Sequence, residues 1–463
     1  MTLGDIEQRI CDKVRSHIAK AGLWNSAYGL RSHLISPAPF DLSTDQVAQL
    51  EKLGEALFRF YHGANELYLR SNHEWVRNYL DIGKPDGLIR HARMHYHKHS
   101  IPRIIRPDIL IRCDGFVITE LDSVPGGFGH LDCLSAAYDD AGFDLIGSPR
   151  SVRDGFAQSL REAAGIDDPV CAIVVSEESV DYLPEMTYLA GELQKIELRA
   201  YTLRPSEIEF TEGGLFVEKD SEKLRIDLIY RFFELFDLLN IPKSELVSYA
   251  ARKKTTIVTP PYKHFLEEKM LLAFLHSESL KDYWVKSLGD DNYKLLISTV
   301  SPTWIMDNRA VPPHAQISGF KWKGRPIRDW REIIEGTQKD RRLVLKPSGF
   351  SPLAWGSRGV KIGHDMPGNE WADTANTALS SFENSPYVIQ PYHDSAIIGV
   401  KYCDENRTLE MQARVRLCPY YFVADDRANL GGVLATACPK DKKLIHGMVD
   451  AIMMPCQSKS SRL

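Results

Sequence analysis

The sequence predicts a mixed α/β (α+β) fold with a helical N-terminal segment. Apolar residues in the first 100 positions recur three to four apart, as in "TDQVAQLEKLGEALFRFYHGANELYLRS", which is the spacing of one helix face. From residue 168, "VCAIVVS" reads as a fully buried strand, "YLPEMTYLAGELQKI" as a helix and "LRAYTL" as the next strand. This order is typical of a parallel sheet of the nucleotide-fold type. A long α+β region follows to residue 456.

Composition limits the classes of function. The chain has 463 residues, of which 43% are hydrophobic and 26% charged, so it resembles a globular protein of two or three domains. Its net charge of -5 argues against nucleic-acid binding through a general basic field. We expect a cytoplasmic protein without a membrane span, because no apolar run approaches ~18 residues. The eight cysteines include no CxxC pair and are expected to be core thiols.

The segment "RPDILIRCDGFVITELDSVPGG" predicts a hairpin that carries acids on one face. We expect a three-residue turn at 113–115 with Gly115 in the left-handed position. Asp108 then lies opposite Glu120, and Asp122 follows two residues further along the same face. The other face is almost wholly apolar and carries Ile109, Ile111, Val117, Thr119 and Leu121.

Three carboxylates this close repel one another unless a cation lies between them. Oxygen ligands on a rigid hairpin suit Mg²⁺ or Mn²⁺, so Asp108, Glu120 and Asp122 are predicted metal ligands. The alternative is a solvated hairpin end on which the acids point outward.

The segment "RRLVLKPSGFSPLAWGSRGVKIG" indicates a short apolar strand that ends at Lys346, a loop rich in Gly and Ser, and a second strand. Such a loop can lay backbone N–H groups over phosphates while the lysine supplies a positive charge. The alternative is a surface lysine beside a flexible turn. No GxxxxGK[ST] motif occurs, so the chain has no P-loop. A third segment, "SPYVIQPYHDS", predicts a buried strand that ends in a turn at Pro391.

Together these three segments resemble the ATP-grasp superfamily, whose members join a carboxylate to an amine with ATP. The hairpin is similar to that family's metal-binding pattern, except that Asp122 stands where many members have Asn. The acidic segment precedes the lysine strand here, whereas in most members it comes last. This order resembles the circularly permuted ATP-grasp group, which includes proteins similar to glutathionylspermidine synthetase, and the resemblance covers about residues 101–455.

The resemblance implies a two-lobed fold and a role for each matching residue. Lys346 corresponds to the ATP lysine, "YVIQPYHDS" to the adenine hinge, and Lys269 is the residue we expect as the second ATP lysine. Lys269 could equally be an ordinary lysine on a helix surface. Arg106 and Arg358 are expected to hold a substrate carboxylate or an oxyanion. The full set of expected ATP-binding residues is Lys269, Lys346, Ser348, Gly356, Ser357, Gly359, Gln390 and Tyr392.

The resemblance implies three regions: the acidic hairpin and helix of the ATP-grasp C-lobe at 101–160, an inserted preATP-grasp domain at 161–255, and the remaining ATP-grasp domain at 256–456. The helical segment at 1–100, which the apolar spacing predicts, precedes them and is not explained by the resemblance. The implied activity is an ADP-forming carboxylate–amine ligase that works through an acyl phosphate, with ATP and Mg²⁺ or Mn²⁺. The expected substrates are a small carboxylate and an amine, such as an amino acid or a small peptide. A small-molecule kinase and a non-catalytic nucleotide-binding protein remain as alternatives. Arg414 and Arg416 either line the acceptor pocket or form structural ion pairs.

Overall fold

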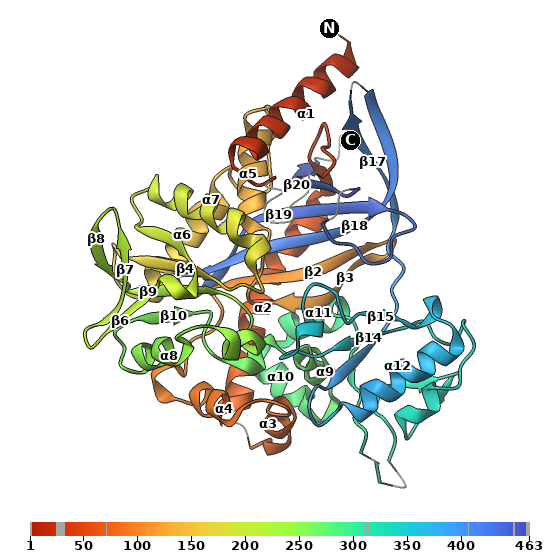
Figure 1. The fold of residues 1–463 in the computed structure, drawn as a ribbon. Coiled ribbons are helices and arrows are strands. Elements are labelled where there is room, and N and C mark those ends of the chain that lie inside the picture. Colours follow the sequence, from red (N-terminus) through yellow and green to blue (C-terminus); the bar gives the residue numbers. More distant parts are fainter. Residues whose placement is uncertain are drawn as a thin grey trace.

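The computed structural model describes residues 2–24, 33–70, 72–309, 311–312, 315–405, 407–447 and 450–459. Within these ranges the fold is mixed α/β, and its largest sheet combines early and late segments of the chain (Figure 1). Strand β1 runs parallel to β20, and the other neighbours in this sheet are antiparallel. The strands lie in the order β1 (Phe40–Ser43), β20 (Ile452–Lys459), β19 (Arg427–Pro439), β18 (Arg407–Ala424), β2 (Ile104–Arg112) and β3 (Gly115–Asp122), and β17 (Ile397–Asp404) also pairs with β18.

Helices cover both faces of this sheet. Tyr421 and Phe422 are neighbours in β18, so their side chains point to opposite faces. The hydroxyl of Tyr421 donates to the carbonyl of Leu50, 2.6 Å away in helix α2 (Thr44–Arg70). On the other face, Gly155 of α6 (Ser151–Ala164) lies so close that a Cβ there would sit 2.8 Å from the ring of Phe422. Helix α5 (Phe128–Asp139) packs beside α6.

The first 100 residues are mostly helical, as the periodicity predicts, but they also supply β1 to the large sheet. Helix α1 lies at one end of the molecule next to β17 (Figure 1). The helices of this segment are α1 (Leu3–Lys20), α2, α3 (Glu74–Leu80) and α4 (Asp86–Ala92).

The predicted strand, helix, strand unit is confirmed as part of a parallel sheet in the order β10, β9, β4, β5. The segment "EFTEGGLFVEK", which follows this unit, predicts a small hairpin that is also present and gains a third strand. The elements of this region are β4 (Cys171–Val175), α7 (Leu183–Gln194), β5 (Ala200–Leu203), β6 (Glu209–Thr211), β7 (Gly214–Lys219), β8 (Glu222–Arg225), β9 (Leu228–Phe232), α8 (Ser244–Arg252) and β10 (Ile257–Thr259).

A third sheet, in the order β11, β16, β14, β15, holds the lysine strand. Strand β14 (Leu343–Pro347) pairs with β15 (Lys361–Ile362) and with β16 (Tyr387–Pro391), so the three strands expected in this region are confirmed as neighbours. The remaining elements are α9 (Met270–Leu275), α10 (Lys281–Leu288), α11 (Asp290–Thr299), β11 (Trp304–Ile305), β12 (Lys321–Trp322), β13 (Arg325–Pro326) and α12 (Gly368–Ser380).

The segment "PPYKHFLEEKMLLAFLHS" predicts a single helix that begins at its prolines, and this prediction is wrong in one respect. A 3-10 turn at His264–Glu267 ends at Glu268, whose backbone is extended, and α9 begins only at Met270. The carboxylate of Glu268 forms a buried ion pair with Lys84, 2.5 Å away, and accepts from Ser348 Oγ. These contacts hold the chain out of helical geometry at this position. Lys269 therefore lies at a break between two short helices.

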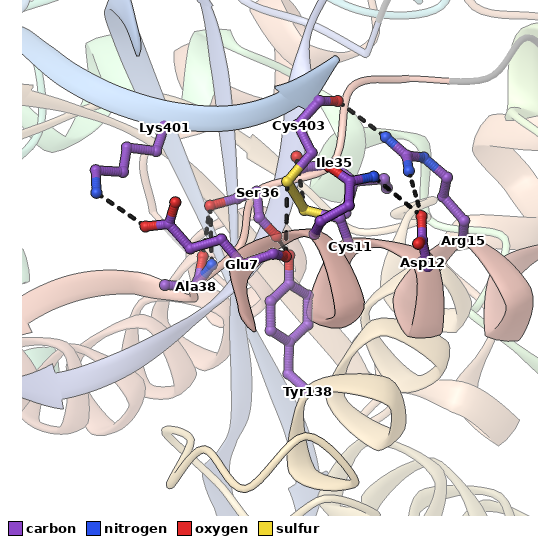
Figure 2. Close-up of a disulfide and its surroundings, with 11 residues drawn as sticks. Glu7, Cys11, Asp12, Arg15, Ile35, Ser36, Ala38, Tyr138, Lys401 and Cys403 are labelled. Atoms are coloured by element: carbon purple, nitrogen blue, oxygen red, sulfur yellow. Dashed lines mark hydrogen bonds and ion pairs between the residues drawn. A yellow bond between two sulfur atoms is a disulfide. The ribbon is translucent and has the colours of Figure 1, made fainter. Parts of the chain in front are cut away.

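The expectation for the cysteines is also wrong, because Cys11 of α1 and Cys403 of β17 form a disulfide across a sequence separation of 392 (Figure 2). Lys401 of the same strand pairs with Glu7 of α1 at 2.9 Å. The other six cysteines are free. No helix in the described part of the chain combines the length and the apolar character that crossing a bilayer requires.

Candidate functional site

A pocket of about 790 Å³ lies where the three main sheets approach one another. The acidic hairpin and β18 form its floor, and the end of β9, the break at Lys269 and the loop after β14 form its other walls. Of the expected site residues, those that line it are Arg106, Asp108, Glu120, Asp122, Lys269, Gly356, Ser357 and Arg358.

The hairpin brings Asp108 opposite Glu120, as the sequence predicts, but by a different route. Its turn has two residues, Cys113 and Asp114, because Arg112 already pairs with Gly115. The expected three-residue turn is therefore wrong, and it shifts the register by one residue. A β-bulge at Thr119 shifts the register back, since Asp108 pairs with Glu120 whereas Ile109 pairs with Ile118.

The bulge also changes which side chains are buried. Ile109, Ile111 and Val117 are buried as expected, and Ile118 joins them. Leu121 was expected in the core, but it is only partly buried and lines the pocket. The carbonyl of the bulged Thr119 accepts hydrogen bonds from two side chains, as described below.

Two arginines neutralise the carboxylates on the pocket floor. Arg106 lies 3.0 Å from Asp108 and 3.0 Å from Asp122, and it donates to the Gly126 carbonyl at 3.0 Å. Arg416 donates to Asp108 at 2.8 Å. Burial opposes ionisation of Asp108, but the two guanidinium groups outweigh it and hold its pKa below the ordinary value. Asp122 behaves differently, because burial raises its pKa despite Arg106, with Asp108 and Glu120 adding to the rise.

Both lysines predicted from the sequence reach this hairpin. Lys269 Nζ lies 2.9 Å from Glu120 Oε1 and donates to the carbonyl of Ala354 at 3.1 Å. Burial acts to lower the pKa of Lys269, but Glu120 outweighs it, so the pKa is raised. Lys346 Nζ donates to the bulged Thr119 carbonyl at 3.0 Å, and burial lowers its pKa. If a triphosphate with its metals lay between Lys346 and the carboxylates, the sequence would predict a separation of roughly 10 to 15 Å across a cleft. Lys346 instead contacts the acidic strand directly.

Five of the expected nucleotide-binding residues lie outside the lining of this pocket: Lys346, described above, and Ser348, Gly359, Gln390 and Tyr392. Gln390 is buried, and it donates to the Thr119 carbonyl at 3.3 Å and to Thr303 at 2.9 Å. Ser348 is buried under Lys269, where its carbonyl accepts from the Lys269 amide at 2.9 Å. Tyr392 packs against His364 and Arg342 in the third sheet. Gly359 packs against Pro347, where a Cβ would come within 2.5 Å of that ring.

The loop after β14 forms the roof of the pocket. Arg358 is paired with Glu178 at 2.5 Å, which ties the loop to the parallel-sheet region. Trp355 of this loop packs against Tyr182, with ring centroids 6.0 Å apart. In this structure Arg358 is therefore engaged by a protein carboxylate at the pocket edge.

Several pocket acids were not predicted from the sequence. Glu234 and Glu267 face Asp122 across the pocket, and burial raises the pKa of both carboxyls, with mutual repulsion adding to it. Arg231 donates to Glu267. Glu185 accepts from the amides of Gly127 and Gly129 at 2.8 and 2.9 Å, and burial raises its pKa to about 7. An acid inside the apolar run "YRFFELF" was the available sequence signal for Glu234.

The donor set allows a limited role for a divalent cation. Among the described residues, no group of three or more His, Cys, Asp or Glu side chains is positioned to hold a metal ion. Asp108 is held by two arginines, and Asp122 accepts from the Val124 amide at 2.9 Å besides pairing with Arg106. Within the described ranges of the chain, only Oε1 of Glu120 has a protein partner, and its other carboxylate oxygen has none. Mg²⁺ typically uses one or two carboxylates together with substrate phosphates, so Glu120 fits such an ion best and Asp122 second.

Of the two arginines on β18 left open by the sequence, only Arg416 lines the pocket. Its Nε is buried without a hydrogen-bond partner. Arg414 instead donates to the carbonyl of Lys440 at 2.8 Å and to Ser395 Oγ at 3.0 Å. Arg414 is thus structural, whereas Arg416 offers a positive group to the pocket.

Comparisons with known proteins place the fold. No family model and no curated protein sequence matches the chain. Among solved structures, it is similar to a glutathione synthetase-like effector from Globodera pallida in its apo form, with a TM-score of 0.55 and 12% identity over 98% of this chain and 97% of that one. A protein from Methylobacillus flagellatus KT, described as a "Putative gamma-glutamylcysteine synthetase", gives a TM-score of 0.42 and 10% identity over 88% and 85% of the two chains. At 12% identity the first likeness concerns the fold alone.

Proposed function

We propose that this chain is an ATP-dependent carboxylate–amine ligase of the circularly permuted ATP-grasp type, which forms an amide bond and releases ADP and phosphate. The observation that supports this most is the meeting of three distant segments at Glu120. Lys269 contacts Glu120 itself, and Lys346 contacts the neighbouring Thr119 carbonyl. Lys269 lines the pocket beside Glu120, and Lys346 contacts the same strand from outside the pocket lining. A lysine beside a carboxylate suits a polyphosphate bound with a cation.

In this proposal the phosphates lie between Lys269 and the loop that carries Gly356 and Ser357. Glu120, with Asp122, would hold Mg²⁺ or Mn²⁺, which when bound neutralises the charge that develops during phosphate transfer. A phosphate oxygen that reaches Lys269 replaces Glu120 as its partner, and this frees the carboxylate for the cation. The adenine site is assigned to the β16 region next to Gln390.

The carboxylate substrate attacks the γ-phosphate, and the resulting acyl phosphate is attacked by the amine with loss of phosphate. Arg416 suits the substrate carboxylate or the oxyanion better than Arg106, because Arg106 is already bound by Asp108, Asp122 and Gly126. Arg358 can reach the reacting groups only after it leaves Glu178. The loop from Ser348 to Gly359 would then exclude water, which protects the acyl phosphate from hydrolysis.

The substrates we propose are an amino acid or small peptide as the acid and a small amine as the acceptor. The test is ADP and phosphate release by the purified protein across pairs of such acids and amines, with mass analysis of the organic product. A ligase gives ADP, phosphate and a new amide, whereas a kinase gives ADP and a stable phosphorylated product.

Lys269→Met supplies the matched negative variant, and Lys339→Met, which changes an exposed lysine outside the pocket, is the control. Loss of ADP release in the first and retention in the second supports the proposal. ADP release that is equal in both variants contradicts it.

A further inference from the structure

Two histidines face each other at the wall of the pocket. His33 Nε2 and His130 Nε2 are 2.8 Å apart, and the ring centroids are 4.9 Å apart. His130 belongs to the first turn of α5, three residues after Gly127. Trp24 packs edge-on against His33 at 5.4 Å. All three side chains line the same pocket as Glu120.

Hydrogen bonding fixes which nitrogen carries each proton. His33 Nδ1 lies 3.0 Å from the Leu34 carbonyl, which can only accept, so Nδ1 of His33 is the protonated nitrogen. Burial lowers the pKa of His33 to about 4 and that of His130 to about 3, so both rings are neutral near pH 7. His33 Nε2 is then an acceptor, and His130 Nε2 must donate to it. His130 Nδ1 is left as an unprotonated acceptor.

No hydrogen bond to His130 Nδ1 is found within the described ranges of the chain. The His130 side chain is only partly buried and lines the pocket, so its ring can be reached from the pocket. The lining of the same pocket includes the apolar side chains of Leu23, Leu434 and Met453 and the polar ones of Thr436, His446 and Asp450. Within this lining, His130 Nδ1 is an acceptor whose protonation state is fixed by the contact with His33.

We propose that His130 Nδ1 accepts a hydrogen bond from an uncharged N–H or O–H group of the amine substrate and thereby selects that substrate, with His33 as the positioning residue that fixes the tautomer. This inference rests on the proposed ligase function, because the bound amine is a substrate only if the chain is a ligase. The ring is a poor general base, because burial opposes its protonation. His130 contributes to recognition, and it acts on the affinity of the protein for the amine substrate.

The first test measures the protonation of the two histidine rings directly and does not depend on enzymatic activity. Nitrogen-15 spectra of the full chain at pH 7 should show His33 protonated at Nδ1 and His130 protonated at Nε2. The probes are serine against O-methylserine, and glycinamide against glycine methyl ester, since each pair differs in one hydrogen-bond donor. The donor-bearing member should shift His130 Nδ1 and the other should not. A proton found on His130 Nδ1, equal shifts within both pairs, or no shift with any probe overturns the proposal.

The second test separates recognition from structure. In His130→Gln the side-chain amide reaches the place of Nε2, keeps the His33 contact and loses the acceptor at Nδ1. In His130→Asn the carbonyl takes the place of Nδ1. We expect the KM for the amine to rise roughly 2- to 10-fold in His130→Gln, in line with one hydrogen bond, and less in His130→Asn, with kcat and the KM for ATP unchanged.

His99→Gln changes an exposed histidine outside the pocket and is the control. An equal rise in both His130 variants, or a fall in kcat alone, contradicts the proposal. If wild-type protein releases no ADP with any acid and amine, the ligase function fails by itself, and the spectra still decide the role of His130.

Discussion

Lys269 Nζ and Glu120 Oε1 lie 2.9 Å apart, although one residue belongs to a break between two helices and the other to the acidic hairpin. The Lys269 side chain is 10% exposed and that of Glu120 is 29% exposed. A buried ion pair is costly to break from one side, because the remaining charge then lacks a partner. Substitutions of Glu120 and Lys269 should therefore affect both the stability of the protein and its activity, and the two effects can be compared.

We expect Glu120→Gln to lower turnover by a factor of order 10² or more, about 3 kcal/mol of transition-state stabilisation, because the substitution removes the charge that would hold the cation. Nucleotide binding should weaken less. The measurement is ADP release with a productive acid and amine, together with a thermal melt. Asp114→Asn, in the exposed turn of the same hairpin, is the control. Equal rates in wild type and Glu120→Gln would show that this carboxylate is not catalytic.

Lys269→Met should lower the free energy of unfolding by roughly 1–3 kcal/mol, because it leaves Glu120 partly buried without its partner. The double variant Glu120→Gln/Lys269→Met should recover part of this loss. Chemical unfolding of the wild type, both single variants and the double variant gives the coupling free energy. Additive losses would mean that the two residues do not interact in solution.

Glu185 predicts a dependence of stability on pH. Its pKa is raised to about 7 in the folded protein against 4.5 for the free side chain. The folded state thus favours the protonated form, so this contribution to stability is complete below about pH 4.5 and is lost as pH rises through about 7. Wild type should lose up to roughly 3 kcal/mol relative to Glu185→Gln between pH 5 and 8. Parallel unfolding curves against pH for the two proteins would contradict this. Glu177→Gln, an exposed neighbour, is the control.

The disulfide predicts the number of free thiols and bears on the cellular compartment of the protein. Unfolded, unreduced protein should show six reactive thiols and not eight. Replacing Cys11 and Cys403 by Ser should cost roughly 2–5 kcal/mol, whereas Cys113→Ser, at an exposed site, should cost little. Disulfides persist mainly in oxidising compartments, which opposes the cytoplasmic expectation. Alkylation of thiols in intact cells before lysis distinguishes the two, and eight alkylated cysteines would show that the bond does not form there.

The acidic hairpin shows what sequence reasoning can reach. Alternation along "ILIRCDGFVITELD" predicts two strands and an acidic face, because the period of a strand is two. The turn length was misjudged, since a two-residue turn and a three-residue turn both fit Cys113 to Gly115. No local sequence signal predicts the bulge at Thr119. The carbonyl of Thr119 accepts hydrogen bonds from Lys346 and Gln390, which come from another sheet.

Residues that reach the site through tertiary contacts were the ones missed. Glu234 and Glu185 lie after β9 and in α7, and their distance from the hairpin depends on how the parallel sheet docks. Lys269 lines the pocket, but its local structure differs from the expected helix, because the buried Lys84–Glu268 pair breaks the helix. Hydrophobic periodicity indicates which face of a helix or strand is buried, but it does not identify contact partners that are distant in the sequence.

The bond between Cys11 and Cys403 also turns most of the polypeptide into a covalent ring, with 10 residues before it and 60 residues after it (Figure 2). A protease that cuts once inside this ring produces two chains that stay joined. The nicked protein should therefore migrate as one species without reductant and as two fragments with it. A cut in the exposed part of the loop that carries Leu353 would then leave both halves of the pocket attached to each other. Split forms of this protein are consequently expected to survive purification as long as the ring stays oxidised.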